Sequence, residues 1–278
     1  MNDFYLDFVG VGPQRTGTSW LHQMLLCHPR ICFPKDVKET MFFDQRYNKG
    51  LGWYKTHFGH WQDGQLRGEI GPTYFDDIPA PNRIYDLNSE CKVIINLRSP
   101  VDRAWSSYRH HIAKGRVEPS FQQATEKIPQ IIEAGHYGQH IPRWLDKFGP
   151  DQVTFILQED IGSRPGKVLA SIFRFLNIEI VDASQISNIR FSTVNGIPRY
   201  RWMARLASSS ATWLRAHRLH RINDFGKKLG LPNIYGGSQQ TIAPLKPTER
   251  DWLLSIYEPD IAFVETILER DLSTWRNS

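Results

Sequence analysis

The first residues that could do chemistry form a glycine-containing loop, Gly12–Ser19, with the sequence GPQRTGTS. Its spacing matches the skeleton of a phosphate-binding loop, in which backbone N–H groups and the N-terminus of the next helix bind an anion. Thr16, Thr18 and Ser19 add hydroxyl donors, and Arg15 adds a positive charge. Thr18 stands where nucleotide hydrolases need lysine, which argues against hydrolysis of ATP or GTP. An ordinary strand-to-helix turn would show the same glycines.

A second pair of polar residues follows the apolar run 92–97. Arg98 comes directly after this run, and Ser106 lies eight residues further on. Ligands of parallel sheets bind at the carboxyl ends of the strands, so a cation at a strand end and a hydroxyl in the next helix can converge on one phosphate. Taken singly, Arg98 would be interpreted as a cation in a loop and Ser106 as a serine on the surface of a helix.

Together the two segments resemble motifs of the sulfotransferases that use 3′-phosphoadenosine 5′-phosphosulfate (PAPS) as the sulfuryl donor. Arg15–Leu21 (RTGTSWL) is similar to their 5′-phosphosulfate loop, and Asn96–Tyr108 (NLRSPVDRAWSSY) is similar to their 3′-phosphate motif. The resemblance implies a fold like that of phosphate-loop nucleotide kinases and a PAPS site that needs no metal. It assigns PAPS binding to Arg15, Thr16, Gly17, Thr18, Ser19, Trp20, Arg98 and Ser106.

Arg15 departs from the family pattern, because many members carry lysine at this position. Arginine keeps the positive charge but does not give up its proton at physiological pH. We therefore expect Arg15 to act in catalysis only by stabilising charge on the leaving phosphate.

The acceptor side of the site is indicated by Lys38–Asp44 (KETMFFD) and the downstream Gly50–Tyr54 (GLGWY). These resemble the Lys-Glu-x-x-Phe-Phe signature of heparan-type and related bacterial sulfotransferases, which implies that Glu39 is the general base. A hydroxyl is a poor nucleophile, so a carboxylate must take its proton as sulfur is attacked. Glu39 and Lys38 would otherwise be interpreted as surface residues. Heparan-modifying members carry lysine where this chain has Ile70, which weakens the case for heparan as the acceptor.

Several alternatives stay open beside this hypothesis. Cytosolic sulfotransferases of the steroid and phenol type use a histidine base, and His57, His60, His110 and His111 are candidates, although none stands in a motif that matches the family. The chain could also be a phosphate-loop nucleotide kinase or a nucleotide-binding protein without catalytic activity. Glu39 ranks ahead of the histidines.

Three short apolar runs, each followed by a helical pattern, would position these residues. The runs are 5–11, 92–97 and 153–157, and the first two helices begin at Thr18 and Pro100. Repeated strand-to-helix units produce parallel strands covered by helices. The sequence therefore predicts an α/β fold with a central parallel sheet flanked by helices.

The segments between these units are expected to be insertions into one sulfotransferase domain that spans 1–278. Residues 38–90 are aromatic and rich in loop-forming residues, while 120–148 are expected to be helical, with Pro142 at a helix start. Residues 195–247 are basic and show no periodicity, which predicts a long mobile excursion over the surface.

Composition limits the remaining possibilities. Of 278 residues, 40% are hydrophobic and 23% are charged, which excludes disordered, collagen-like and coiled-coil classes. The net charge of +5 suits an anionic ligand but is too small to predict nucleic-acid binding. Cys27, Cys32 and Cys91 indicate neither a disulfide framework nor a zinc site. We expect a cytoplasmic protein without a membrane span that acts on a hydroxyl or amine acceptor; the sequence indicates neither the acceptor's identity nor an oligomeric state.

Overall fold

The computed structural model describes residues 4–181, 206 and 242–277, which fall into two compact units. The first, called the sheet unit below, comprises Met1–Ser99, His136–Phe191 and Pro259–Asp271. The second, called the helical unit, comprises Pro100–Gly135, Ser192–Glu258 and Leu272–Ser278. A single domain over 1–278 stays a prediction.

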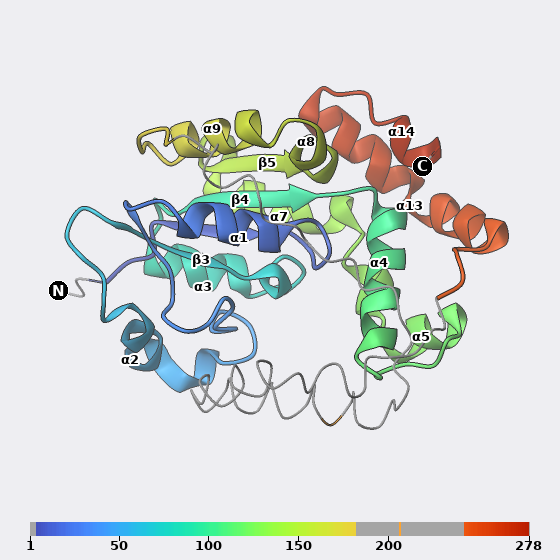
Figure 1. Ribbon diagram of the computed structural model, residues 1–278, viewed down its shortest axis with the longest axis horizontal. Helices are drawn as coiled ribbons and strands as arrows, with labels where there is room; N and C mark the ends of the chain where they lie inside the picture. Colours follow the sequence, from blue (N-terminus) through green and yellow to red (C-terminus); the bar gives the residue numbers. More distant parts are fainter. Residues whose placement is uncertain (1–3, 182–205, 207–241, 278) are drawn as a thin grey trace. The chain divides into compact units, whose positions relative to one another are not determined.

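A five-stranded parallel sheet is the centre of the sheet unit (Figure 1). The strands run in the order β2-β3-β1-β4-β5, and every neighbouring pair is parallel. They are β1 (Phe8–Val11), β2 (Ile31–Cys32), β3 (Leu66–Ile70), β4 (Lys92–Leu97) and β5 (Val153–Leu157). Strand β1 is buried along its whole length, as strands covered on both faces require. The predicted α/β fold with a central parallel sheet is confirmed.

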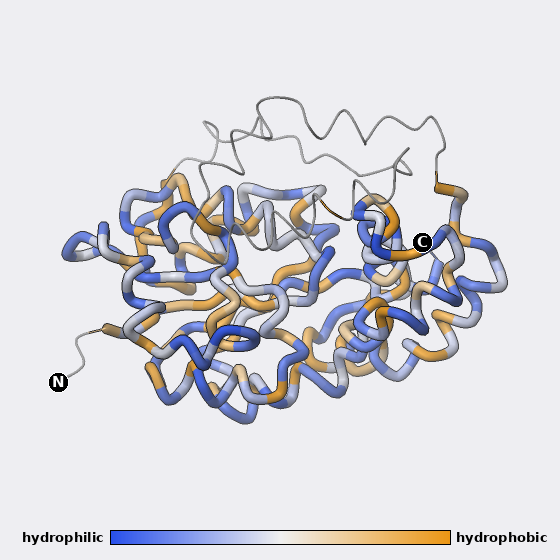
Figure 2. The backbone as a smooth tube through the Cα atoms, turned by 90° about the horizontal axis from the view of Figure 1, so that it is seen from below, coloured by the Kyte–Doolittle hydropathy of each residue, from blue (hydrophilic) through white to orange (hydrophobic). Residues whose placement is uncertain are grey.

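Helices cover this sheet. Helices α1 (Thr18–Leu26) and α9 (Pro165–Phe175) share an apolar cluster with Phe8, Ile94 and Ile156. Helix α7 (Tyr137–Phe148) contacts β4, β5 and α3 (Ala80–Leu87). Figure 2, coloured by hydropathy, shows apolar and hydrophilic stretches alternating along the backbone. The remaining elements of this unit are α2 (Gly50–Lys55), α8 (Gln158–Ser163), and the 3₁₀ turns η1 (Tyr47–Lys49), η2 (Thr56–Phe58), η3 (Pro72–Tyr74) and η4 (Pro150–Gln152).

Strand β3 lies within 38–90, where only a loop-rich insertion was expected. Its sequence, LRGEI, carries two charges and a glycine, which strands usually avoid. Both charged side chains are nevertheless buried, and Arg67 stacks over the Trp61 ring with 3.8 Å between its Cζ atom and the ring centroid. The strand is tolerated because distant residues supply partners for its charges.

The predicted helix start at Pro142 is wrong, because Pro142 lies inside α7. The helix begins earlier, at Tyr137, where the Gly138 N–H donates to Asp260 Oδ1 at 2.8 Å. The other carboxylate oxygen of Asp260 lies 3.0 Å from His136 Nδ1. A residue distant in sequence therefore caps this helix.

The helical unit has its own apolar core. Val101, Tyr108 and Ile112 are buried on one face of α4, and Trp105 packs against the same cluster. The helices of this unit are α4 (Pro100–Ala113), α5 (Phe121–Lys127), α6 (Gln130–Glu133), α14 (Thr274–Asn277) and the first part of α13 (Pro247–Leu268), whose later residues belong to the sheet unit.

The excursion predicted for 195–247 lies outside the described residues, apart from residue 206 and 242–247. Among the helices in the described ranges, none is both long and apolar enough to cross a membrane.

A substitution at Gly12 tests how closely the loop after β1 approaches the backbone of Asn96. The Gly12 φ of +122° disfavours other residues, and a Cβ there would lie 2.5 Å from the backbone N of Asn96. We expect Gly12→Ala to lower the free energy of unfolding by about 2–4 kcal/mol in urea titrations, because strain and overpacking add. Gly52→Ala is the control, since a Cβ at Gly52 meets nothing within 4 Å. Equal stability of the two variants would contradict the close approach.

Candidate active site

The loop between β1 and α1 has the backbone conformation of an anion cradle. Gly12, Arg15 and Gly17 all have positive φ, of 122°, 79° and 95°. Such turns direct successive backbone N–H groups toward a common point, and the first N–H groups of a helix have no partner within that helix. Residue 17 has little space, because a Cβ there would lie 2.9 Å from Ile161 Cδ1. The loop therefore presents N–H groups at the start of α1.

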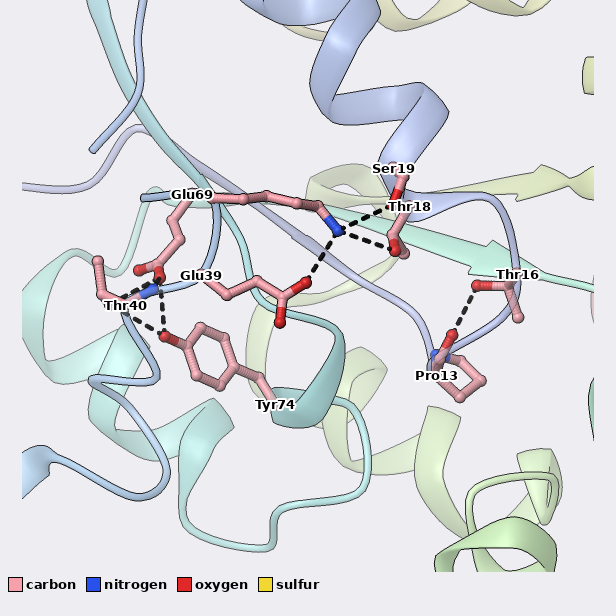
Figure 3. A network of polar contacts seen from close by, with 9 residues as sticks. Pro13, Thr16, Thr18, Ser19, Glu39, Thr40, Glu69 and Tyr74 are labelled. Atoms are coloured by element: carbon pink, nitrogen blue, oxygen red, sulfur yellow. Dashed lines mark hydrogen bonds and ion pairs between the residues drawn. The ribbon is translucent and has the colours of Figure 1, made fainter. Parts of the chain in front are cut away.

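The side chains of the loop divide between support and exposure. Thr16 is fully buried, and its hydroxyl donates to the Pro13 carbonyl at 2.8 Å, so this hydroxyl closes the loop (Figure 3). Trp20 belongs to the apolar cluster beneath α1. Thr18 is almost buried, whereas Ser19 is exposed. Only some of the side chains predicted to bind the donor are therefore presented at the surface.

The chain returns to this loop at Lys38 and Glu39. The Lys38 ammonium lies 3.5 Å from Thr18 Oγ1 and 3.4 Å from Ser19 Oγ, and it pairs with Glu39 Oε1 at 2.9 Å. Figure 3 shows the Glu39 carboxylate on the side of Thr18 and Ser19. The Glu39 side chain is 26% exposed, so it is accessible to a reactant. The predicted base and the predicted donor loop thus lie together.

Arg98 is the third cationic residue near the loop, beside Arg15 and Lys38. It follows β4, and its guanidinium donates to the Arg15 carbonyl at 3.5 Å. The Arg98 carbonyl accepts a bond from the Tyr137 hydroxyl at 2.8 Å, which fixes the backbone at this point. His22 adds no positive charge near pH 7, because burial, followed by the charge of Lys38, lowers its pKa to about 4.

Ser106 and two of the alternative bases lie in the helical unit. Ser106 is half-buried on α4, as are His110 and, more deeply, His111. The convergence of Ser106 with Arg98 on one phosphate stays a prediction. In the sheet unit, buried His57 meets the Trp53 ring edge-on at 4.7 Å between centroids, and His60 Nε2 lies 3.5 Å from Cys32 Sγ.

A second glutamate, Glu69 on β3, is fully buried beside the Glu39 segment. Its Oε1 accepts bonds from the Thr40 N–H and Thr40 hydroxyl, both at 2.6 Å, and from the Tyr74 hydroxyl at 3.0 Å. Its Oε2 accepts from the Tyr54 hydroxyl at 2.8 Å. Burial raises the pKa of Glu69 to about 7, although the four hydrogen bonds favour the ionised form and oppose this rise.

Aromatic rings enclose the buried glutamate. Phe42 stacks on Tyr54 with centroids 4.5 Å apart, and Phe43 meets both Tyr54 and Tyr74 edge-on. The aromatic signature at 42–43 therefore packs on the two tyrosines that bond to Glu69, while Glu39 remains partly exposed.

Comparison with known proteins identifies the family. A model of the sulfotransferase domain matches residues 6–211. This chain belongs to the sulfotransferase family. It is 31% identical over 201 residues to human heparan sulfate glucosamine 3-O-sulfotransferase 3B1, covering 68% of this chain and 50% of that protein. It is 30% identical over 189 residues to bifunctional heparan sulfate N-deacetylase/N-sulfotransferase 1 of Caenorhabditis elegans, covering 62% and 22%.

A solved sulfotransferase structure extends the similarity to nearly the whole chain. The sulfotransferase from Alicyclobacillus acidocaldarius is 25% identical, with a TM-score of 0.70, and covers 98% of this chain and 99% of that one. The two heparan sulfate enzymes named above are longer, and the present chain spans half or less of their length.

Lys38 contacts residues of the candidate site and Glu69 contacts the neighbouring Thr40, but neither is among the predicted site residues. Lys38 stands in the Lys-Glu signature, but the sequence does not indicate that its side chain points to the start of α1. Glu69 could have been found from its position, because a lone carboxylate inside a buried strand requires partners. In the part of the chain that the structure describes, no group of three or more His, Cys, Asp or Glu side chains could hold a metal ion. That catalysis needs no metal stays a prediction.

The buried carboxyl of Glu69 gives this protein a predictable stability profile. The folded pKa of about 7 lies above the unfolded value of 4.5, so the folded state holds the proton more tightly. The free energy of unfolding should therefore fall as pH rises from 4.5 to about 7, by at most about 3 kcal/mol from this group. Glu69→Gln should remove this contribution.

The measurement is urea unfolding of both proteins between pH 5 and 8. Other carboxyls with raised pKa values, such as the half-buried Asp7, also titrate, so the difference between wild type and Glu69→Gln isolates Glu69. Two curves that run parallel across this range would show that Glu69 does not take up its proton near neutrality.

Proposed function

We propose that this protein transfers a sulfuryl group from PAPS to a hydroxyl or amine group of a carbohydrate or small-molecule acceptor. One observation carries the proposal: the Lys38 ammonium joins the Glu39 carboxylate to the hydroxyls of Thr18 and Ser19 at the mouth of the loop. A base and an anion cradle within one hydrogen-bonded group are what in-line transfer from a bound anion requires. Family membership supports the same reaction.

The loop would hold the 5′-phosphosulfate of the donor. Its backbone N–H groups, the N-terminus of α1 and the Ser19 hydroxyl are donors, and the guanidinium of Arg15 and the ammonium of Lys38 supply positive charge. Because the Thr16 hydroxyl is engaged by Pro13, Thr16 would contribute its backbone N–H. Arg98, assisted by Ser106, would bind the 3′-phosphate that distinguishes this donor from ordinary nucleotides.

In the proposed reaction Glu39 takes the proton of the acceptor. The acceptor oxygen or nitrogen forms a bond to sulfur while the bond from sulfur to the phosphate oxygen breaks, and the leaving phosphate keeps the electron pair. Arg15, Lys38 and the loop N–H groups offset the charge that develops on that phosphate. Lys38 would supply the ammonium that many family members carry at the position of Arg15.

The acceptor is proposed only as a class. The curated relatives named above are heparan sulfate enzymes, and their names include both O- and N-sulfotransferases. At position 70, however, the side chain is a fully buried Ile70 in the cluster beneath α1, so no cation is available there. This supports an acceptor other than heparan. The cytoplasmic location stays a prediction.

The donor assignment is tested with 3′-phosphoadenosine 5′-phosphate and AMP. We expect the first to bind more tightly, and Arg98→Ala to remove about 1.5–3 kcal/mol of that preference, because a charge-assisted bond to the 3′-phosphate is lost. Titration calorimetry gives both affinities, and Arg174→Ala, at an exposed position of α9, is the control. Equal binding of the two nucleotides, or tighter binding of ATP with magnesium, would favour the kinase-like alternative.

The base is tested with Glu39→Gln, which keeps size and hydrogen bonding while removing basicity. We expect kcat to fall roughly 10²- to 10⁴-fold with donor affinity retained, because Glu39 takes the acceptor proton and is not itself a donor ligand. The assay measures transfer of labelled sulfate, with the exposed Glu90→Gln as control. Near-normal kcat in Glu39→Gln together with an inactive His110 or His111 variant would identify histidine as the base.

A further inference from the structure

We propose that ionised Glu69 is the positioning residue that holds the base Glu39 in place, acting through the peptide bond between Glu39 and Thr40. This inference rests on the proposed function, because it assumes that Glu39 is the base. Glu69 itself is fully buried and does not touch a reactant. Its effect would pass through the Thr40 N–H, which donates to Glu69 Oε1 at 2.6 Å.

The anchor comes from a rigid part of the fold. Glu69 lies on β3, between β2 and β1, and is in register with Val9. The segment that carries Glu39 has no strand or helix of its own, because the chain between β2 and η1 forms only turns. Hydrogen bonds to an interior strand of the sheet therefore substitute for secondary structure there.

The segment after Glu39 needs such an anchor because it contains a strained residue. Met41 has a φ of 55°, a left-handed conformation that residues other than glycine adopt at a cost of about 1–3 kcal/mol. On one side of Met41, Thr40 bonds to Glu69 through both its N–H and its hydroxyl. On the other side, the Phe42 N–H donates to the Tyr74 hydroxyl at 2.9 Å, and that hydroxyl donates to Glu69. Both flanks of the strained residue thus lead to one carboxylate.

Only the ionised carboxylate fits all four partners. The Thr40 N–H is a fixed donor, and the hydroxyls of Thr40, Tyr54 and Tyr74 are oriented as donors by the charge. A protonated carboxyl would carry a hydrogen into a group of donors, so one of the hydroxyls would have to turn and become an acceptor. The bonds to Thr40 and Phe42 would weaken as a result.

The tyrosines and the cysteine that face Glu69 stay neutral near pH 7, so Glu69 is the member of this cluster whose charge changes there. Tyr54 of α2 and Tyr74 of η3 have pKa values raised well above 10, first by burial and then by the Glu69 charge. Asp44 acts on Tyr74 and Cys91 on Tyr54, and burial raises the pKa of Cys91 as well. With the pKa of Glu69 itself raised to about 7, activity should decline below that pH even though the reacting base is Glu39.

The anchor is tested first without any activity measurement. Amide hydrogen exchange of Thr40 and Phe42 is followed between pH 6 and 8 and corrected for the intrinsic rate. The opening that exchanges these amides breaks their bonds but leaves Glu69 buried, so it differs from global unfolding. In the wild type we therefore expect protection to rise about tenfold as Glu69 ionises and its bonds to Thr40 strengthen, and in Glu69→Gln to stay low and flat. Asp7→Asn is the matched control, because Asp7 is a half-buried carboxylate that also accepts a β3 backbone N–H, that of Arg67 at 2.6 Å, two residues before Glu69. It should behave as wild type.

The second measurement is the pH profile of kcat. Glu69→Gln should lower kcat about 10- to 100-fold, the scale of a misplaced catalytic group, while affinity for 3′-phosphoadenosine 5′-phosphate changes less than about twofold. Tyr54→Phe removes only the bond to Oε2, so it should keep kcat at high pH and shift the acid limb upward. It also serves if Glu69→Gln does not fold.

The outcomes separate this inference from the proposed function. A pH-dependent rise in wild-type protection without any sulfuryl transfer would support the anchor and refute the function. Wild-type protection that is flat across pH, or Glu69→Gln with wild-type kcat and pH profile, would overturn the anchor even if the protein is a sulfotransferase.

Discussion

The close approach of the loop after β1 to the end of β4 is the constraint on which the site depends. Gly12 lies against the backbone of Asn96, and this contact leaves no space for a side chain. The chain must therefore turn sharply with positive φ at Gly12, Arg15 and Gly17, and α1 starts at the carboxyl edge of the sheet. Strand β1 lies between β3 and β4, so this start lies beside the ends of both neighbours. The Lys38–Glu39 segment reaches the loop because β3, to which it is anchored, is one of those neighbours.

Charge is distributed between the two sides of this arrangement in different ways. On the loop side, cations and N–H groups remain partly exposed, where they can meet an anion. On the β3 side, one negative charge is placed in a fully buried site, at a cost in solvation that four hydrogen bonds offset only in part. Keeping such a charge is understandable if it fixes a segment that lacks regular structure. Glu39 can then stay near solvent without being mobile.

The sequence predicts the parts of the fold whose signals are local. Runs 92–97 and 153–157 coincide with β4 and β5, because strands buried on both faces are continuously apolar. The glycine spacing predicts the loop after β1, and the helical pattern that begins at Thr18 predicts the start of α1. Strand β3 escapes prediction because its buried carboxylate is satisfied by residues distant in sequence, among them Thr40 and Tyr54. The start of α7 escapes for the same reason, since Asp260 caps it from more than a hundred residues away. Within the candidate site, the family resemblance predicts Glu39 and the loop, and the structure places them together. The direction of the Lys38 side chain depends on how the turn after β2 folds back.

The bond from the Thr16 hydroxyl to the Pro13 carbonyl holds the loop closed through the loop's own residues. A preformed cradle loses little conformational entropy when a phosphate enters, so binding does not have to order it. The same cradle would hold the phosphate of the spent nucleotide as readily as that of the fresh donor, which is uniform binding and brings product inhibition. The groups nearest the sulfuryl group would then have to distinguish the fresh donor from the spent nucleotide. Lys38, which contacts both the loop and Glu39, is one such group.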